Sequence, residues 1–91
     1  MTQASDALVT LDVELCGKLA DGLGAIVPLE IPAAGCRAGD LLELAGQRYP
    51  GLAPHIAAGR VKLCVNDAIV APGAQVTPQD SVALFPPVSG G

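Results

Sequence analysis

Apolar and polar residues alternate from Leu8 to Cys16, with apolar side chains at the odd positions from 9 to 15 and polar ones between them. This period of two predicts a β-strand with one buried face. Residues 25–31 predict a second strand, and Pro28 within it indicates an edge position or a bulge, because proline donates no hydrogen bond to a sheet. The glycine-rich segment 17–24 predicts the loop that joins both strands into an antiparallel hairpin.

The spacing of apolar residues then changes to that of a helix, which we expect to begin at Arg37 or Ala38. Its apolar stripe, which must cover the hairpin, consists of Leu41, Leu42, Leu44 and Ala45. No Ser, Thr or Asn precedes it, so we expect the helix to begin without a side-chain cap. The Tyr-Pro-Gly sequence at 49–51 ends it. Residues 52–59 have room for only a short helical turn, because Pro54 excludes a longer one.

Three further strands are predicted in the second half of the chain. Residues 61–65 alternate again, Asn66-Asp67 is a turn signal, and residues 69–70 give a very short strand. Residues 71–80 are rich in turn-forming residues, and residues 81–85 give the last strand. The order strand, strand, helix, strand, short strand, strand predicts an α+β fold, with one mixed sheet packed on one main helix. We expect the first and last strands to pair at the centre of this sheet.

The composition indicates a single folded domain over residues 1–91. Hydrophobic residues make up 51% of the chain, and with only Tyr49 and Phe85 as aromatic residues the core must be aliphatic. The net charge is −4 and the five basic residues are scattered, which argues against nucleic acid as a partner, because phosphate binding needs clustered Lys and Arg. No apolar run approaches the length of a membrane span, and the first residues lack the pattern of a secretion signal. We therefore expect no membrane association and a cytoplasmic location.

The cysteines and the single histidine form no recognisable metal or catalytic motif. Cys16, Cys36 and Cys64 are widely spaced without a CxxC, so no metal site is expected. We expect Cys16 and Cys64 to be small, mostly buried residues, and Cys36 to lie in a loop, as an ordinary surface cysteine or as an exposed thiol with a lowered pKa. His55 has no Ser or Cys partner and is expected in a loop. These features favour a non-catalytic carrier or interaction module over an enzyme.

The last residues read Leu84-Phe85-Pro86-Pro87-Val88-Ser89-Gly90-Gly91. Gly90 and Gly91 have no Cβ, so they fit a channel too narrow for side chains. Pro86 and Pro87 restrict φ and keep the segment extended. We expect the last six residues to be a flexible tail that delivers its terminal carboxylate to another protein; an incidental frayed end is the alternative. Phe85, at the base of the tail, has two open roles, as a docking contact or as the only phenylalanine of the core.

Three parts of the sequence resemble the ubiquitin-like sulfur carriers, which include the small subunit of molybdopterin synthase and the thiamine-pathway sulfur carrier. They are residues 39–42 with Tyr49-Pro50 around the helix, residues 65–67 at the turn, and residues 80–91 at the end. The double proline before Val-Ser-Gly-Gly resembles the molybdopterin synthase subunit more than the thiamine carrier. The resemblance covers residues 8–91 and implies a β-grasp (ubiquitin-like) fold.

The resemblance also implies that Gly91 is the functional residue. Its carboxylate is a poor electrophile when ionised. A ubiquitin-activating-type adenylyltransferase would use ATP to form an acyl-adenylate there, and a sulfurtransferase would replace AMP to leave a thiocarboxylate. Val88, Ser89 and Gly90 would thread into a pocket of the large synthase subunit, where the sulfur attacks the pterin precursor away from water. Docking contacts are implied at the base of the tail, at Phe85, Pro86 and Pro87.

By the same resemblance, the carrier binds no cofactor itself and assembles with two large subunits as a heterotetramer. Two loaded carriers would be consumed for each dithiolene of the molybdenum cofactor. A sulfur carrier for thiamine, cysteine or tRNA thiolation, or a ubiquitin-like protein modifier, remains open, because each uses an activated C-terminal glycine. A β-grasp electron carrier is disfavoured because an iron–sulfur centre needs clustered cysteines. A plain interaction domain is the remaining alternative.

Overall fold

The predicted hairpin consists of β1 (Leu8–Leu15) and β2 (Ile26–Pro32) in the computed structural model, which describes residues 7–86. Pairing is antiparallel and continuous along both strands. β2 lies at the edge of the sheet, as Pro28 indicates. The predicted loop contains a short 3-10 helix, η2 (Gly17–Ala20).

The main helix, α1 (Ala38–Arg48), begins where the sequence predicts and has no side-chain cap at Arg37. Just before it, β3 (Cys36–Arg37) pairs with β6 (Gln75–Val76) in a small second sheet, which the sequence patterns did not predict. A two-residue strand is too short to show a period of two, so its pairing is visible only in three dimensions. Cys36 therefore lies in a strand and not in the expected loop.

The remaining elements are α2 (Ala53–Ala57), β4 (Lys62–Val65), β5 (Ala68–Ile69) and β7 (Val82–Phe85). The turn between β4 and β5 has positive φ at both Asn66 (53°) and Asp67 (70°), the conformation that these residue types favour in tight hairpins. β5 begins one residue earlier than predicted. The short helical turn before β4 is confirmed.

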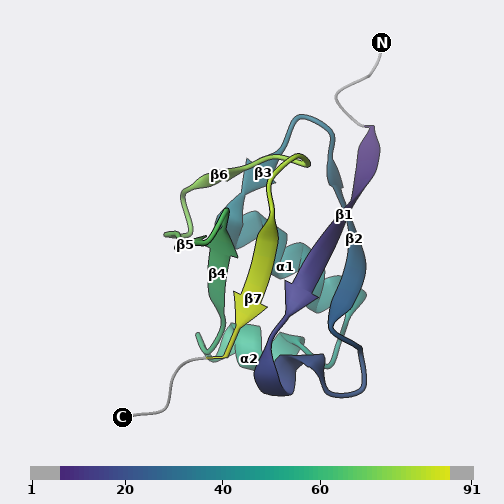
Figure 1. Cartoon of the computed structure of the whole chain (residues 1–91), viewed down its shortest axis with the longest axis vertical. Helices are drawn as coiled ribbons and strands as arrows, with labels where there is room; N and C mark the ends of the chain where they lie inside the picture. The colour runs from purple at the N-terminus through teal and green to yellow at the C-terminus, as the bar shows by residue number, and fades with distance from the viewer. Residues whose placement is uncertain (1–6, 87–91) are drawn as a thin grey trace.

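The five strands of the main sheet lie in the order β2-β1-β7-β4-β5, and β1 and β7 run parallel beside each other (Figure 1). α1 crosses one face of this sheet, and α2 lies near the end at which β7 stops. A mixed sheet of this order on one main helix confirms the predicted α+β, β-grasp fold. Among the described residues, no helix is both long and apolar enough to cross a membrane.

The core between the sheet and α1 is aliphatic, as expected from the scarcity of aromatic residues. Its most deeply buried large side chains are Ile31, Leu41, Leu52, Leu84, Val13 and Val76. Tyr49 is the one aromatic residue of the buried cluster, and its hydroxyl donates a hydrogen bond to the carbonyl of Pro28. The end of α1 is thereby joined to the edge strand.

Candidate functional site

The C-terminal end of β7 is where the predicted tail leaves the domain. β7 pairs with β1 on one side and with β4 on the other, and its Val82 and Leu84 are 3% and 0% exposed. A partner that holds the tail is therefore linked to the core through a strand paired on both sides. The predicted tail-threading and sulfur-bearing residues lie outside the described residues, and their roles stay predictions: Pro87, Val88, Ser89, Gly90 and Gly91.

Pro86, the first tail residue, packs on Gly17 at the start of η2. A Cβ built on Gly17 would lie 3.2 Å from Cγ of Pro86, which is tighter than most carbon contacts. Gly17 also has φ of +58°, a conformation in which glycine carries no steric penalty. Gly17 was not predicted to be part of the site. Only the parallel pairing of β1 with β7, two segments far apart in the sequence, brings it beside Pro86.

Phe85 is partly exposed and lies opposite Lys62 of β4, outside the buried cluster. Of its two open roles, the structure therefore excludes that of a core phenylalanine. The docking role is untested and remains the prediction for this residue.

Phe85 belongs to an exposed face of the main sheet, opposite the face that packs on α1. Strand pairing places Glu14 beside Ala83, Ala83 beside Cys64 and Cys64 beside Ile69. We call this surface the outer sheet face; it consists of Glu14, Ile26, Lys62, Cys64, Ile69, Ala83 and Phe85. Its large apolar members, Ile26 and Ile69, are 63% and 69% exposed. Ile26 and Ile69 lie on the two edge strands, with Glu14, Ala83 and Cys64 between them, and the same face continues to Asp12 and Glu30.

Two of the three cysteine thiols, those of Cys16 and Cys36, have raised pKa values. Cys16, Cys36 and Cys64 are all free and of intermediate exposure, which is compatible with the mostly buried positions expected for Cys16 and Cys64. Burial, with smaller effects from Glu14 and Cys64, raises the pKa of Cys16. Burial and the charge of Asp40 also raise the pKa of Cys36, which contradicts the alternative of an exposed thiol with a lowered pKa and favours that of an ordinary cysteine. The structure therefore does not support a reactive Cys36.

His55 is exposed on α2 and not in the predicted loop. Pro54 stands in the first turn of that helix, where its missing N–H costs no intrahelical hydrogen bond. His55 lines a shallow hollow together with Lys18 and Asp21. No group of three His, Cys, Asp or Glu side chains that could hold a metal occurs between residues 7 and 86.

Comparison with known proteins identifies the family. The model of the ThiS family matches residues 13–91. This chain belongs to the ThiS family. Together with the structural matches below, the result confirms the predicted membership of the ubiquitin-like sulfur carriers. A search of curated protein sequences found no match.

Several solved structures share this fold. SAMP1 from Haloferax volcanii is 26% identical, with a TM-score of 0.74 over 91% of this chain and 100% of that chain. A putative molybdopterin converting factor subunit 1 from Pyrococcus furiosus is 23% identical, with a TM-score of 0.72 over 88% of this chain and 99% of that chain. A complex of subunits 1 and 2 of molybdopterin-converting factor from Helicobacter pylori matches at 20% identity, with a TM-score of 0.59 over 91% and 100% of the two chains.

Proposed function

We propose that this ThiS-family carrier is the small subunit of a molybdopterin synthase, with the carboxylate of Gly91 as its working group. The observation that carries the proposal is the family match, which extends from β1 to the diglycine at 90–91. Two features of the fold support it. β7 leads straight into the Pro-Pro segment, and the outer sheet face offers apolar docking area beside Phe85.

The proposed chemistry begins at the C-terminal carboxylate. Attack of a Gly91 carboxylate oxygen on the α-phosphate of ATP forms an acyl-adenylate and releases pyrophosphate, in the active site of an adenylyltransferase. A sulfur nucleophile supplied by a sulfurtransferase then displaces AMP, and the carrier leaves with a thiocarboxylate. In the large synthase subunit, this sulfur attacks the pterin precursor in a pocket shielded from bulk solvent. One water molecule then hydrolyses the acyl C–S bond, which leaves the sulfur on the pterin and returns the carboxylate of Gly91.

A large subunit is the partner that we propose for the outer sheet face and the tail. A complex of subunits 1 and 2 is known for the structurally similar protein from Helicobacter pylori, which supports this assignment. We propose two carriers and two large subunits in the assembly. We propose a cytoplasmic location, where ATP is available to the activating partner. ATP is a substrate of the activating partner, and the carrier itself binds no cofactor in this scheme.

Intact mass spectrometry tests the proposal directly. The purified chain is incubated with ATP, an adenylyltransferase, a sulfurtransferase and a sulfur source, and we expect a mass gain equal to the replacement of one oxygen by sulfur. Fragmentation should place the gain on Gly91. The loaded carrier, mixed with a large subunit and the pterin precursor, should then yield the dithiolene product. A carrier that gains sulfur but never supports this second step would contradict the molybdopterin assignment.

A protein modifier of the SAMP type is the second candidate, favoured by the 26% identity with SAMP1 from Haloferax volcanii. The same acyl-adenylate serves both functions, and they differ in the nucleophile that attacks Gly91. A lysine amine gives an isopeptide bond, which survives denaturation and reduction. Adducts of this kind in cells expressing the tagged chain would support the modifier function.

A further inference from the structure

The free edge of β2 carries an alternation that follows from its pairing with β1. The N–H of Leu15 donates to the carbonyl of Ala25, and the N–H of Ala33 donates to the carbonyl of Ala7. Because the register between these two ends is continuous, the odd-numbered residues of β2 direct their backbone groups toward β1. The even-numbered residues, Ile26, Pro28, Glu30 and Pro32, direct theirs away from it.

Most of these outward backbone groups cannot form hydrogen bonds with an added strand. Pro28 and Pro32 have no N–H, and their carbonyls are used by the hydroxyl of Tyr49 and by the N–H of Gly35 at 2.8 Å. Glu30 stands between the two prolines, and its outward N–H and C=O have no partner within residues 7–86. Glu30 is therefore the one position between the prolines at which a chain can form a pair of backbone hydrogen bonds.

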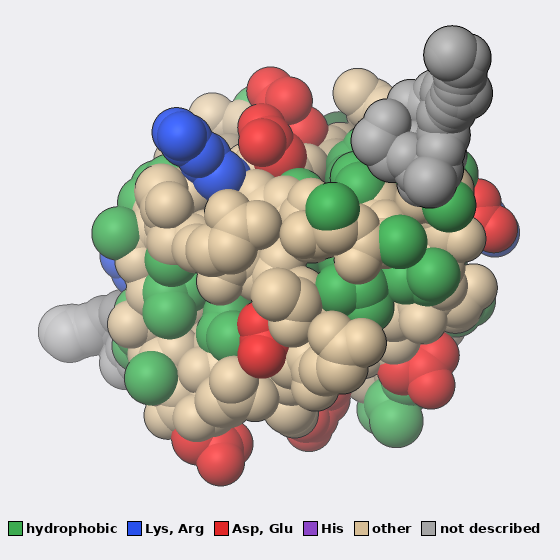
Figure 2. All heavy atoms as spheres, turned by 90° about the horizontal axis from the view of Figure 1, so that it is seen from above, with side chains coloured by type: hydrophobic (Ala, Val, Ile, Leu, Met, Phe, Trp, Pro, Cys, Tyr) green, Lys and Arg blue, Asp and Glu red, His purple; other side chains and the backbone are tan. Residues whose placement is uncertain are grey.

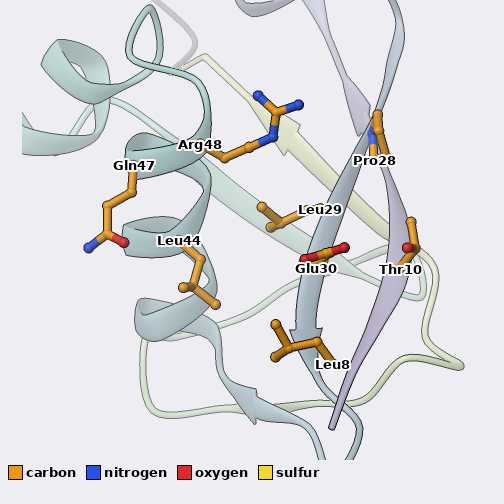
Figure 3. Close-up of a pocket in the computed structure, with 8 residues that line it drawn as sticks. All are labelled: Leu8, Thr10, Pro28, Leu29, Glu30, Leu44, Gln47 and Arg48. Atoms are coloured by element: carbon orange, nitrogen blue, oxygen red, sulfur yellow. The ribbon is translucent and has the colours of Figure 1, made fainter. Parts of the chain in front are cut away.

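A groove lies beside this position, between β2 and α1 (Figure 3). Its volume is about 480 Å³, and its lining residues are Leu8, Thr10, Pro28, Leu29, Glu30, Leu44, Gln47 and Arg48. Leu29 points from the strand toward the helix, and Leu44 points from the helix toward the strand. The unpaired backbone groups of Glu30 thus lie next to a cleft that offers apolar Leu29 and Leu44 and, from α1, also polar Gln47 and charged Arg48.

We propose that this edge binds an extended segment of a partner protein with an apolar–basic–apolar sequence. The central residue of the segment pairs with Glu30 through two backbone hydrogen bonds, as in strand addition. Its side chain then lies on the same face as that of Glu30, where a Lys or Arg forms a favourable cross-strand pair. The residues before and after it point to the other face, toward Leu29 and Leu44.

The same geometry disfavours a second copy of this chain at the edge. Antiparallel pairing centred on Glu30 would place the two Glu30 side chains directly opposite each other, and like charges so placed are destabilising. The net charge of −4 adds to this repulsion. Neither the contact between two Glu30 side chains nor the net negative charge opposes the binding of a basic segment of another protein. The groove lies beside β2 and not at the end of β7, so a carrier engaged through its tail can still bind there.

Nuclear magnetic resonance titration of the full-length, ¹⁵N-labelled chain tests the proposal with the peptide acetyl-Thr-Val-Lys-Ile-Thr-amide. We expect saturable shifts centred on the amides of Glu30, Leu29 and Leu44, with a Kd on the order of 1 mM or below. The same peptide methylated on the lysine backbone nitrogen should bind much more weakly. Replacing its lysine by glutamate should weaken binding about two- to fivefold. Saturation that is equal for all three peptides would overturn the proposal, as would shifts confined to the outer sheet face.

Variants on the protein side give matched controls. Glu30→Lys should reverse the preference, so that the glutamate peptide binds better than the lysine peptide. Leu44→Gln should weaken binding, whereas Leu42→Gln, on the same helix but away from this groove, should not. An unchanged preference in Glu30→Lys overturns the proposed pairing. None of these measurements depends on sulfur transfer, so their outcome is independent of the proposed function.

Discussion

At the scale of single residues, Gly17 combines two requirements at the base of the tail. Its φ of +58° is a conformation that residues with a Cβ adopt at a cost, and its missing Cβ leaves room for Pro86. Gly22 shares the first requirement, with φ of +78°, but nothing lies within 4 Å of its Cβ position. A side chain at Gly22 would therefore meet backbone strain alone, whereas a side chain at Gly17 would meet both backbone strain and Pro86.

We predict that Gly17→Ala lowers the free energy of unfolding by more than Gly22→Ala does. Both substitutions cost about 1 kcal/mol of left-handed backbone strain. Gly17→Ala adds crowding against Pro86. In urea unfolding, Pro86→Ala should therefore recover part of the loss in Gly17→Ala and none in Gly22→Ala. Equal losses with no recovery would show that Pro86 does not rest on Gly17.

At the scale of elements, β7 presents neighbouring residues to opposite faces of the sheet. Leu84 is 0% exposed and packs in the core, whereas Phe85 is 37% exposed on the outer sheet face. Adjacent positions of one strand thus place one side chain in the core and the next on the surface, because successive side chains of a strand alternate between faces.

We predict that Leu84→Ala lowers the free energy of unfolding by about 3 kcal/mol, as a buried leucine truncated to alanine leaves a cavity. Phe85→Ala should cost about 1 kcal/mol or less. It should nevertheless raise the Kd for the large subunit about tenfold, as expected for an exposed aromatic contact at an interface. Calorimetric titration and urea unfolding measure the two effects. Unchanged affinity in Phe85→Ala would remove this residue from the docking surface.

The turn between β4 and β5 is tied to the start of β7 by side chains. Asp80 accepts hydrogen bonds from the N–H of Thr77 (2.8 Å) and from Nδ2 of Asn66 (3.1 Å), while Oδ1 of Asn66 accepts one from the N–H of Ser81 (3.0 Å). The bond from the Thr77 N–H, followed by that from Asn66, lowers the pKa of Asp80. The charged carboxylate is thus the form that the folded state prefers.

This lowered pKa predicts a pH dependence of stability. The stabilisation is fully present above the ordinary aspartate pKa of 3.8, and it is lost as the pH falls through the lower folded-state value. Asp80→Asn should therefore be less stable than the natural chain at pH 7, with a gap that narrows in acid. Asp12→Asn, on the exposed side of β1, serves as the control for removing one acidic charge. A gap that does not change with pH would contradict a role for the carboxylate charge.

At the scale of the whole molecule, the C-terminal end of β7 is the place where the chain continues into the predicted tail. Viewed from the end near the N-terminus, acidic side chains are spread around the surface with few basic ones among them, in keeping with a net charge of −4 (Figure 2). The outer sheet face exposes Ile26, Ile69 and Phe85 among charged residues such as Glu14 and Lys62, and it adjoins the end of β7. The described contacts that stabilise the body lie within residues 7–86.

We predict that deleting Gly90 and Gly91 leaves the thermal midpoint unchanged, because the buried core of the described residues ends at Leu84 and glycine has no side chain to add to it. The same deletion should abolish adenylation and sulfur loading, which need the carboxylate of Gly91 in a narrow channel. Calorimetry and intact mass spectrometry of one preparation measure both effects. A truncated chain that still accepts sulfur would refute the proposed role of the diglycine.

The sequence by itself determined the elements whose patterns are long enough to be periodic. The alternation of β1, the edge position implied by Pro28 and the uncapped start of α1 are all local properties, and the structure confirms each. The roles assigned to the tail rest on the local restrictions of proline and glycine, and they stay predictions because residues 87–91 lie outside the described residues.

Only the tertiary structure decided which distant residues meet. β3 and β6 are too short for a periodic signal, so their pairing and the place of Cys36 needed the fold. The outer sheet face exists because strand register sets residues from β1, β2, β4, β5 and β7 side by side. Register depends on long-range hydrogen bonds and on a shared core, and neither is a property of any single segment.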